Sequence, residues 1–298
     1  MKAAPFDYVR ADSLPHALAV LAEHGADAKL LAGGMSLVPM MAMRLARPAL
    51  LIDIYGLDEL KTLRHRSDAV VTGAAVRQCS LGSDTRLREQ LPLLVQALRW
   101  VGHSQTRNRG TVGGSLVHAD PSAELALVAL VLGARLHLSG QSAGERTVAA
   151  SDFFLGPMFT ATGEAECLTA IEWPVWEGRG TGSAFEEISI RHGDFAMASA
   201  AAQLQLDRKG VVKRASFGVG GADGMPLAFP DLAQKLLGER MTDALAREVA
   251  AAAARLCNPG SDMHASADYR RHLATVLVER VLLQSAQAAT ASLEGVHA

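Results

Sequence analysis

Ala32-Gly33-Gly34-Met35-Ser36 and Thr111-Val112-Gly113-Gly114-Ser115 are the two stretches that decide the interpretation of this chain. Each places a glycine pair after a segment that can be a strand or the turn leaving one, and each continues into a hydroxyl residue and a helical pattern. Glycine lets the main chain approach a phosphate closely, because no Cβ intervenes and positive φ is allowed. Successive backbone N–H groups can then point at phosphate oxygens. Two such segments predict paired main-chain cradles for a ligand with two joined phosphates, such as a dinucleotide.

The composition is that of a folded protein with two domains or three small ones. The chain has 298 residues, of which 49% are hydrophobic, and its formal net charge is −2 with a pI near 6.6. A nucleic-acid-binding protein would need a basic face, so this balance argues against that class. The N-terminus lacks the apolar core of a secretory signal, and no apolar run reaches the roughly 18 residues that span a bilayer. We therefore expect a soluble cytoplasmic protein with no membrane span.

The cysteines are few and far apart. Cys79, Cys167 and Cys257 form no CxxC pair and no cluster with histidine. Iron–sulfur clusters and structural zinc ions need several closely spaced thiolate or imidazole ligands. We therefore expect no metal site in this chain.

The first part of the sequence predicts a small βαβ-like unit. Residues 14–23 read as an amphipathic helix with Ser13 as its N-cap. Residues 29–32 read as a strand that enters the first glycine segment, and residues 37–45 as a Met-rich helix that leaves it. Residues 49–54 read as a buried strand.

The second part predicts further strands and helices around the second glycine pair. Residues 69–73 read as a strand, residues 91–101 as a helix, and the polar, basic stretch 103–111 as a loop. Asp120-Pro121 fits the N-cap and first position of a helix that continues over 125–132, with a strand over 134–138.

The stretch 173–183, with two tryptophans, a proline and three glycines, marks the expected domain boundary. Beyond it the pattern indicates a meander of strands with packed helices, which is typical of an α+β domain. The expected elements are strands over 184–190, 198–206 and 211–219, a hairpin turn over 207–210, and helices over 243–256 and 269–287.

These motifs resemble the flavin-binding medium subunit of molybdenum hydroxylases, the family of carbon monoxide dehydrogenase and xanthine dehydrogenase. The resemblance runs in family order over nearly the whole chain. Its matching segments are Ala32–Leu37, Arg107–Ser115, Ala119–Leu125, Arg191–Ala196 and Ala267–Arg271.

The resemblance implies an α+β protein in three parts. Residues 1–57 and 58–176 would be the two subdomains of an FAD-binding domain of the vanillyl-alcohol-oxidase type. Residues 177–298 would form a C-terminal α+β domain with an antiparallel three-stranded sheet and helices, which helps to cover the flavin.

It also implies a set of FAD-binding residues and no catalytic acid, base or nucleophile. Asp120 and Glu124 match acidic positions near the ribityl and ribose hydroxyls, and Asp194 and Phe195 match the stretch that approaches the isoalloxazine. Both glycine segments would bind the pyrophosphate. The pyrophosphate-binding positions are Leu31, Ala32, Gly33, Gly34, Met35, Ser36 and Leu37 in the first segment and Thr111, Gly113, Gly114 and Ser115 in the second.

Two residues depart from the family pattern, and several have simpler interpretations. Met35 stands where many relatives carry His or Thr, so its side chain cannot donate to phosphate. Phe195 stands where Tyr is frequent, and it could equally be a core aromatic residue. Asp120 could be only an N-cap, and Glu124 only a solvated first-turn acid. Arg107 and Arg109 could bind phosphate or face a partner subunit.

The function that the resemblance implies is electron transfer through FAD. Electrons would arrive from 2Fe–2S clusters on a small partner and leave to an external acceptor, while a large partner with a molybdenum–pterin cofactor would convert the substrate. One alternative is a self-sufficient flavin oxidase or dehydrogenase with a base such as His103, His118 or His192. Another is a non-catalytic nucleotide-binding protein.

Overall fold

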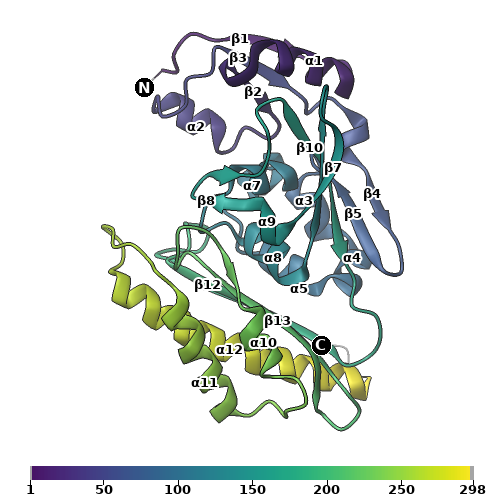
Figure 1. Ribbon diagram of the computed structural model, residues 1–298, viewed down its shortest axis with the longest axis vertical. Helices are drawn as coiled ribbons and strands as arrows, with labels where there is room; N and C mark the ends of the chain where they lie inside the picture. Colours follow the sequence, from purple (N-terminus) through teal and green to yellow (C-terminus); the bar gives the residue numbers. More distant parts are fainter. Residues whose placement is uncertain (1, 296–298) are drawn as a thin grey trace.

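The computed structural model describes residues 2–295 and arranges them around three main sheets and a small two-stranded hairpin. Figure 1 shows the sheets in sequence order, from the N-terminal unit at the top to the C-terminal unit at the bottom. The α+β class is confirmed. The proposed divisions after residues 57 and 176 stay predictions.

The N-terminal sheet is entirely parallel. Its strand order is β1 (Asp7–Arg10), β3 (Leu50–Asp53) and β2 (Ala28–Leu31). Helix α1 (Leu14–His24) begins after Ser13, whose hydroxyl accepts from the His16 amide as an N-cap. Because parallel strands end at one edge, the first glycine segment leaves β2 at the same edge at which β1 and β3 end. Strand β1 is not foreseen from the sequence.

The middle sheet is antiparallel, and its central strand, β10, is the last of its strands in the sequence. Its order is β4-β5-β10-β6-β7, so β10 lies between segments that precede it by many residues. The sequence predicts β5 and β6 but not β10. The strands are β4 (Leu63–His65), β5 (Ala69–Gly73), β6 (Arg135–Gly140), β7 (Gly144–Ala149) and β10 (Glu166–Pro174), with β8 (Phe154–Gly156) and β9 (Phe159–Thr160) forming the hairpin.

Short helices connect the strands of the first two sheets, and two of these helices, α5 and α8, also contact the strands of the C-terminal sheet. Helix α8 is apolar all round after its first residue, because it is buried on more than one side. It packs with α5 in the middle core and also contacts the C-terminal sheet, as Figure 1 shows. The helices are α2 (Leu37–Ala42), α3 (Gln78–Ser83), α4 (Thr85–Gln90), α5 (Pro92–Leu98), α6 (Ser104–Arg109), α7 (Val112–His118), α8 (Glu124–Leu132) and α9 (Ala150–Phe153), with 3₁₀ turns at Gly25–Asp27 and Asp58–Lys61.

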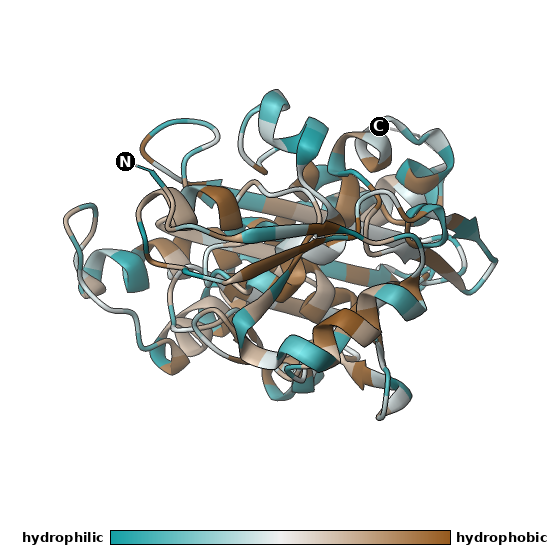
Figure 2. Ribbon diagram, turned by 90° about the horizontal axis from the view of Figure 1, so that it is seen from above, coloured by the Kyte–Doolittle hydropathy of each residue, from teal (hydrophilic) through white to brown (hydrophobic). Residues whose placement is uncertain are grey.

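The C-terminal sheet contains the three predicted antiparallel strands and a short fourth strand. The strands are β11 (Thr181–Ile188), β12 (Ala198–Leu206), β13 (Val212–Gly220) and β14 (Leu227–Ala228), in that order. Its outer face is covered by α11 (Asp243–Leu256) and α12 (Ala267–Glu294), and α10 (Pro230–Gln234) follows β14. Figure 2 shows hydrophobic strands inside and hydrophilic segments concentrated on the surface helices and loops.

Two local predictions are wrong. Residues 104–109 form helix α6 rather than a loop, since their polar composition reflects an exposed face and not a lack of structure. Helix α8 begins at Glu124 after Ala123, so Asp120 is not its N-cap. Instead Asp120 Oδ1 accepts from the Ser122 amide at 2.8 Å and closes a turn before the helix.

At Gly182, strand β11 comes very close to the backbone of α12. A Cβ there would lie 2.1 Å from Ala289 N and 2.3 Å from Ser285 O. We expect Gly182→Ala to lower the free energy of unfolding by about 3 kcal/mol, because overpacking against backbone cannot relax by side-chain rotation. Gly260→Ala, whose added methyl meets nothing within 4 Å, is the matched control. Urea denaturation of both variants tests this, and equal midpoints would contradict it.

Candidate functional site

The two glycine segments lie against each other. A Cβ added to Gly33 would lie 2.3 Å from the carbonyl oxygen of Arg109 and 2.9 Å from the Cα of Gly110. Only glycine fits at such a distance from another main chain. The end of α6 and the segment after β2 are therefore in direct contact, although they are far apart in the sequence.

The first segment offers main-chain donors. Within residues 2–295, the N–H groups of residues 33–37 donate to no protein acceptor. The first helical bonds beyond them run from Val38 N to Gly34 O and from Met40 N to Ser36 O. Gly34 has φ +71°, a left-handed conformation that glycine adopts readily. The segment is thus a half-buried run of unpaired amides, which suits an anionic ligand.

The second glycine pair lies in the first turn of α7 rather than in a loop. Gly113 N donates to Ala74 O at 2.9 Å, and Gly114 N donates to the Thr111 hydroxyl at 3.1 Å. A Cβ on Gly113 would lie 2.5 Å from that of Ala74. Gly113 therefore allows close packing against Ala74 beside the middle sheet, and the amides of both glycines are not the free donors that the sequence predicts. The Thr111 hydroxyl keeps its own proton available, because it serves as the acceptor in its bond with Gly114.

A cation that sequence reasoning missed lies beside this contact. Arg77 forms an isolated bridge with Thr111, and its guanidinium lies 4.5 Å from the ring centroid of Tyr55. Lys61 approaches the same ring at 4.9 Å. Tyr55 follows β3 at the edge from which the first glycine segment leaves. No local motif marks Arg77, because its position results from long-range pairing.

The acidic residues after α7 are buried or engaged. Glu124 is 9% exposed. Burial raises its pKa to about 7, and the charge of Asp120 raises it further, whereas a backbone hydrogen bond and the charge of Arg107 lower it. The alternative of a solvated surface acid is therefore wrong for Glu124. Between the two acids, the Ser122 hydroxyl donates to Ala196 O at 3.0 Å. This bond ties the turn to the C-terminal unit.

The loop that carries Asp194 and Phe195 rests on the segment before α6. His192 and Trp100 pack edge to face at 5.3 Å, and a Cβ on Gly193 would lie 2.6 Å from the His103 ring. Asp194 pairs with Arg191 at 3.0 Å. Phe195 is 73% exposed, so it is not a core residue, and its ring is free to cover a ligand.

Arg107 is held by the main chain next to the same segment. Its Nη1 donates to Val101 O at 2.9 Å and to Gly102 O at 2.8 Å. These bonds fix the turn between α5 and α6, and they give Arg107 a structural role that neither sequence alternative included.

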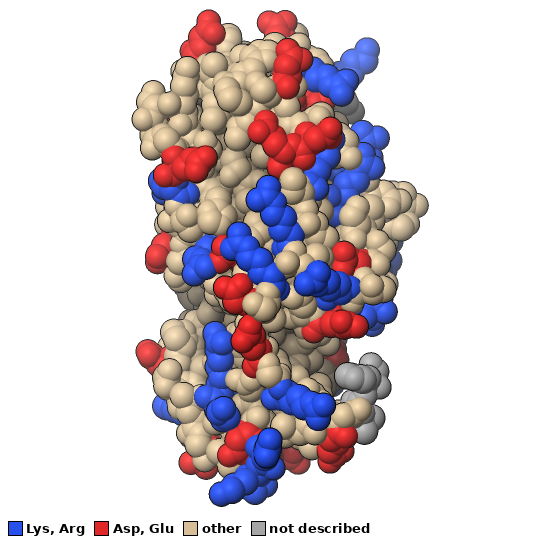
Figure 3. Space-filling model, turned by 90° about the vertical axis from the view of Figure 1, so that its right-hand side faces the viewer, with Lys and Arg blue, Asp and Glu red and all other residues tan. Residues whose placement is uncertain are grey.

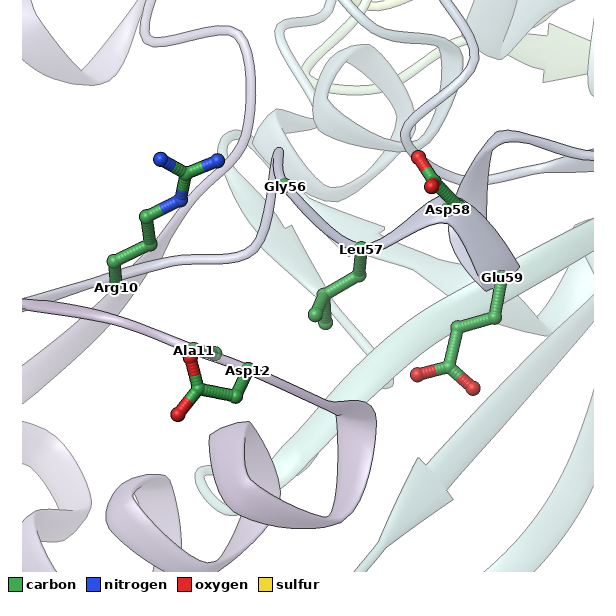
Figure 4. Close-up of a pocket in the computed structure, with 7 residues that line it drawn as sticks. All are labelled: Arg10, Ala11, Asp12, Gly56, Leu57, Asp58 and Glu59. Carbon is green, nitrogen blue, oxygen red and sulfur yellow. The ribbon is translucent and has the colours of Figure 1, made fainter.

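A separate cavity of about 560 Å³ opens beside the ends of β1 and β3 (Figure 4). None of the sequence-predicted site residues lines it. Three carboxylates, those of Asp12, Asp58 and Glu59, share it with a single cation, Arg10. Such a balance repels phosphate, so the glycine contact remains the better candidate site.

Neither the charges on the face in Figure 3 nor the potential metal ligands among the described residues indicate a second site. On the face in Figure 3, basic and acidic residues are interspersed rather than gathered by sign. Among the described residues, no group of three His, Cys, Asp or Glu side chains could hold a metal ion. Burial raises the pKa of Cys167 to about 12, which leaves an unreactive thiol. No helix in the described part of the chain is long and apolar enough to cross a membrane.

Comparison with known families matches two consecutive models. Residues 4–176 match the FAD binding domain in molybdopterin dehydrogenase, and residues 183–285 match the CO dehydrogenase flavoprotein C-terminal domain. The chain is 37% identical to the 6-hydroxypseudooxynicotine dehydrogenase complex subunit alpha of Paenarthrobacter nicotinovorans, over 96% of both chains. It is 36% identical to caffeine dehydrogenase subunit beta of Pseudomonas sp. strain CBB1, again over 96% of both.

Solved structures agree with the sequence comparison. The fold superposes on a chain of reconstituted CO dehydrogenase from Oligotropha carboxidovorans with a TM-score of 0.93 and 34% identity, covering 97% of this chain and 100% of that chain. The contact between the glycine segments and the two matched models point to the same assignment. The chain belongs to the family of FAD-binding medium subunits found in carbon monoxide dehydrogenase and xanthine dehydrogenase.

Proposed function

We propose that this chain is the electron-transfer flavoprotein subunit of a cytoplasmic molybdenum hydroxylase complex. The observation that carries the proposal is the contact of Gly33 with the main chain of Arg109 and Gly110, next to a run of unpaired amides. The match of both halves of the chain to flavoprotein models supports it. The residues present fit a diphosphate, since the amides supply donors and the glycines leave room.

The first segment would bind the pyrophosphate through its main chain. Met35 can contribute its N–H although its side chain has no donor. The second segment would contribute the Thr111 and Ser115 hydroxyls and the close packing that Gly113 and Gly114 permit. The proposed pyrophosphate-binding residues remain Leu31, Ala32, Gly33, Gly34, Met35, Ser36, Leu37, Thr111, Gly113, Gly114 and Ser115.

The remaining site residues would hold the rest of the cofactor. Asp120 and Glu124 would accept from ribityl and ribose hydroxyls, a role that suits carboxyl oxygens. Asp194 and exposed Phe195 would approach the isoalloxazine from the C-terminal unit. The bond from Ser122 to Ala196 supports this arrangement, because it holds the Phe195 loop beside the acidic turn.

FAD, when bound, supplies one- and two-electron redox chemistry, and the protein supplies binding, orientation and shielding from water. Relatives named as dehydrogenase complex subunits support a division of labour. We propose that a small subunit with 2Fe–2S clusters delivers electrons and that a large molybdenum–pterin subunit converts the substrate. An external acceptor would receive the electrons.

Purification of the native complex, with flavin and metal analysis of each separated subunit, tests this function. We expect FAD on this chain, and molybdenum and iron on the partners. The isolated chain should show a flavin absorption spectrum but no substrate turnover. Turnover by the isolated chain would favour the self-sufficient oxidase, and failure to bind added FAD would refute the flavoprotein assignment.

Replacing Gly33 should weaken FAD binding. Gly33→Ala forces the first segment away from Arg109, and a clash of this kind costs about 1–3 kcal/mol. That cost corresponds to about a ten- to hundredfold loss of affinity if it falls on the cofactor site. Flavin fluorescence titration measures the effect. Gly82→Ala, with nothing within 4 Å of the added methyl, should bind FAD normally.

The Thr111 hydroxyl can be tested by a pair of substitutions. Thr111→Val removes both the cap on Gly114 N and the free O–H donor, and we expect about a tenfold loss of FAD affinity, in line with the net value of one hydrogen bond. Thr111→Ser keeps the hydroxyl and should retain most of the affinity. Isothermal titration of both with FAD decides the matter, and equal affinities would argue against a role for the hydroxyl.

A further inference from the structure

The C-terminal sheet faces α8 with a row of polar residues. Register places Glu187 on β11 opposite Ser199 on β12, and Ser199 opposite Gly220 on β13. Directly opposed residues project from the same face of a sheet. A Cβ on Gly220 would lie 2.6 Å from Ser199 Oγ and 3.6 Å from the carbonyl oxygen of Pro121. The row therefore meets the chain just before α8, at the seam between the two parts of the protein.

Two side chains of this row are buried without hydrogen bonds. Glu187 is 2% exposed, and neither of its carboxyl oxygens has a partner within the described residues. Ser199 is fully buried, and its hydroxyl also lacks a partner there. An ionised carboxylate in such a place is strongly unfavourable unless it is paired. Buried oxygens without partners therefore require a proton on Glu187, a bridging water molecule, or both.

Within residues 2–295, no cation forms a hydrogen bond with the Glu187 carboxyl group. Apart from Glu124, the segments α5, α8 and β12 that pack around it contain no ionisable side chain. Glu124 is the charged group whose field acts on Glu187. On β13, Lys213 and Arg214 lie at the opposite end from Gly220, and Arg214 stacks on the Trp176 ring at 4.0 Å.

The nearby arginines are engaged with main-chain oxygens. Arg107 and Asp120 act on Glu124, but Arg107 donates to the carbonyls of residues 101 and 102. Arg270, on α12 beyond the sheet, donates to Met197 O and Gly221 O and pairs with Asp262. These arginines are thus engaged elsewhere, and none of them pairs with Glu187.

We propose that Glu187 keeps a proton at neutral pH, with buried water bridging Glu187 and Ser199. The seam between the FAD-binding part and the C-terminal sheet then carries a proton site. A carboxyl group that is buried without a hydrogen-bond partner favours its neutral, protonated form. The proposal concerns the chain itself and does not require bound FAD.

The raised pKa of Glu187 determines how the folding stability changes with pH. Burial, and then the nearby Glu124, raise the pKa of Glu187 to about 8, and burial raises that of Glu124 to about 7. The folded chain therefore keeps a proton that the unfolded chain releases above the usual glutamate range. Folding stability falls as pH rises through this window, by up to about tenfold in the unfolding equilibrium constant per pH unit for one proton.

The proton site lies under the loop that is proposed to cover the flavin. Glu187 is the second-last residue of β11, and the loop with Asp194 and Phe195 follows the strand. Glu124 starts α8 two residues after Ser122, which holds that loop at Ala196. Loss of this proton would place an unpaired negative charge in the seam at the base of the cover.

Paired glutamine variants of the full chain test the proposal. The ratio of the unfolding equilibrium constant of the wild type to that of Glu187→Gln should rise between about pH 5 and pH 8, by up to about tenfold per unit. Glu186→Gln is the matched control, because Glu186 points toward α12 and accepts from Gln284. Its ratio should not change with pH. A flat ratio for Glu187→Gln, or the same slope in both variants, would overturn the proposal.

A second measurement covers the case in which Glu187→Gln does not fold. Infrared spectroscopy of the wild-type chain at pH 7 should show the C=O stretch of a protonated carboxylic acid, and the band should vanish on unfolding at the same pH. No such band in the folded chain would mean that Glu187 is ionised, which also overturns the proposal. Because FAD is absent from both measurements, their failure would leave the proposed flavin role untouched.

Discussion

The approach of Gly33 to the main chain of Arg109 and Gly110 is the constraint on which the proposed site depends. Two segments from different sheets meet there at a separation that no side chain permits. Each is anchored behind the contact: the first leaves the parallel edge of the N-terminal sheet, and the second rests through Gly113 on Ala74, whose own amide donates to Thr169 of β10. The N-terminal sheet thus supports one side of the contact and the middle sheet the other.

In the proposed site, the C-terminal unit would act as a cover rather than as a second support. It reaches the acidic turn through Ser122 and the segment before α6 through His192 and Gly193. Helix α8 links these contacts to the core, because one helix serves the hydrophobic interior of both parts. An all-apolar helix is the expected solution where two sheets share one layer of helices.

Much of this could be predicted from local sequence signals, and the rest could not. The glycine pairs, the Ser13 cap and the Asp207 hairpin turn carry their meaning in a few neighbouring residues, and the family motifs were specific enough to assign the cofactor type. In contrast, β10 and the Arg77–Thr111 bridge depend on long-range pairing, which leaves no local pattern. Asp120 misled as a cap because an Asx turn uses the same residues. In the sequence, Glu187 resembles an ordinary strand residue. Only the packing of the C-terminal sheet shows that its carboxyl group is buried without a hydrogen-bond partner.

The position of β10 has a consequence for the order of assembly. This strand is made after all its neighbours, yet it separates β5 from β6 and holds the residue that anchors Ala74. During synthesis, β5 and β6 each keep one unpaired edge until this segment leaves the ribosome. Long-range closure of this kind is slow and exposes edges to wrong pairing. The nascent chain therefore cannot form a cofactor-ready site until its final central strand has been inserted.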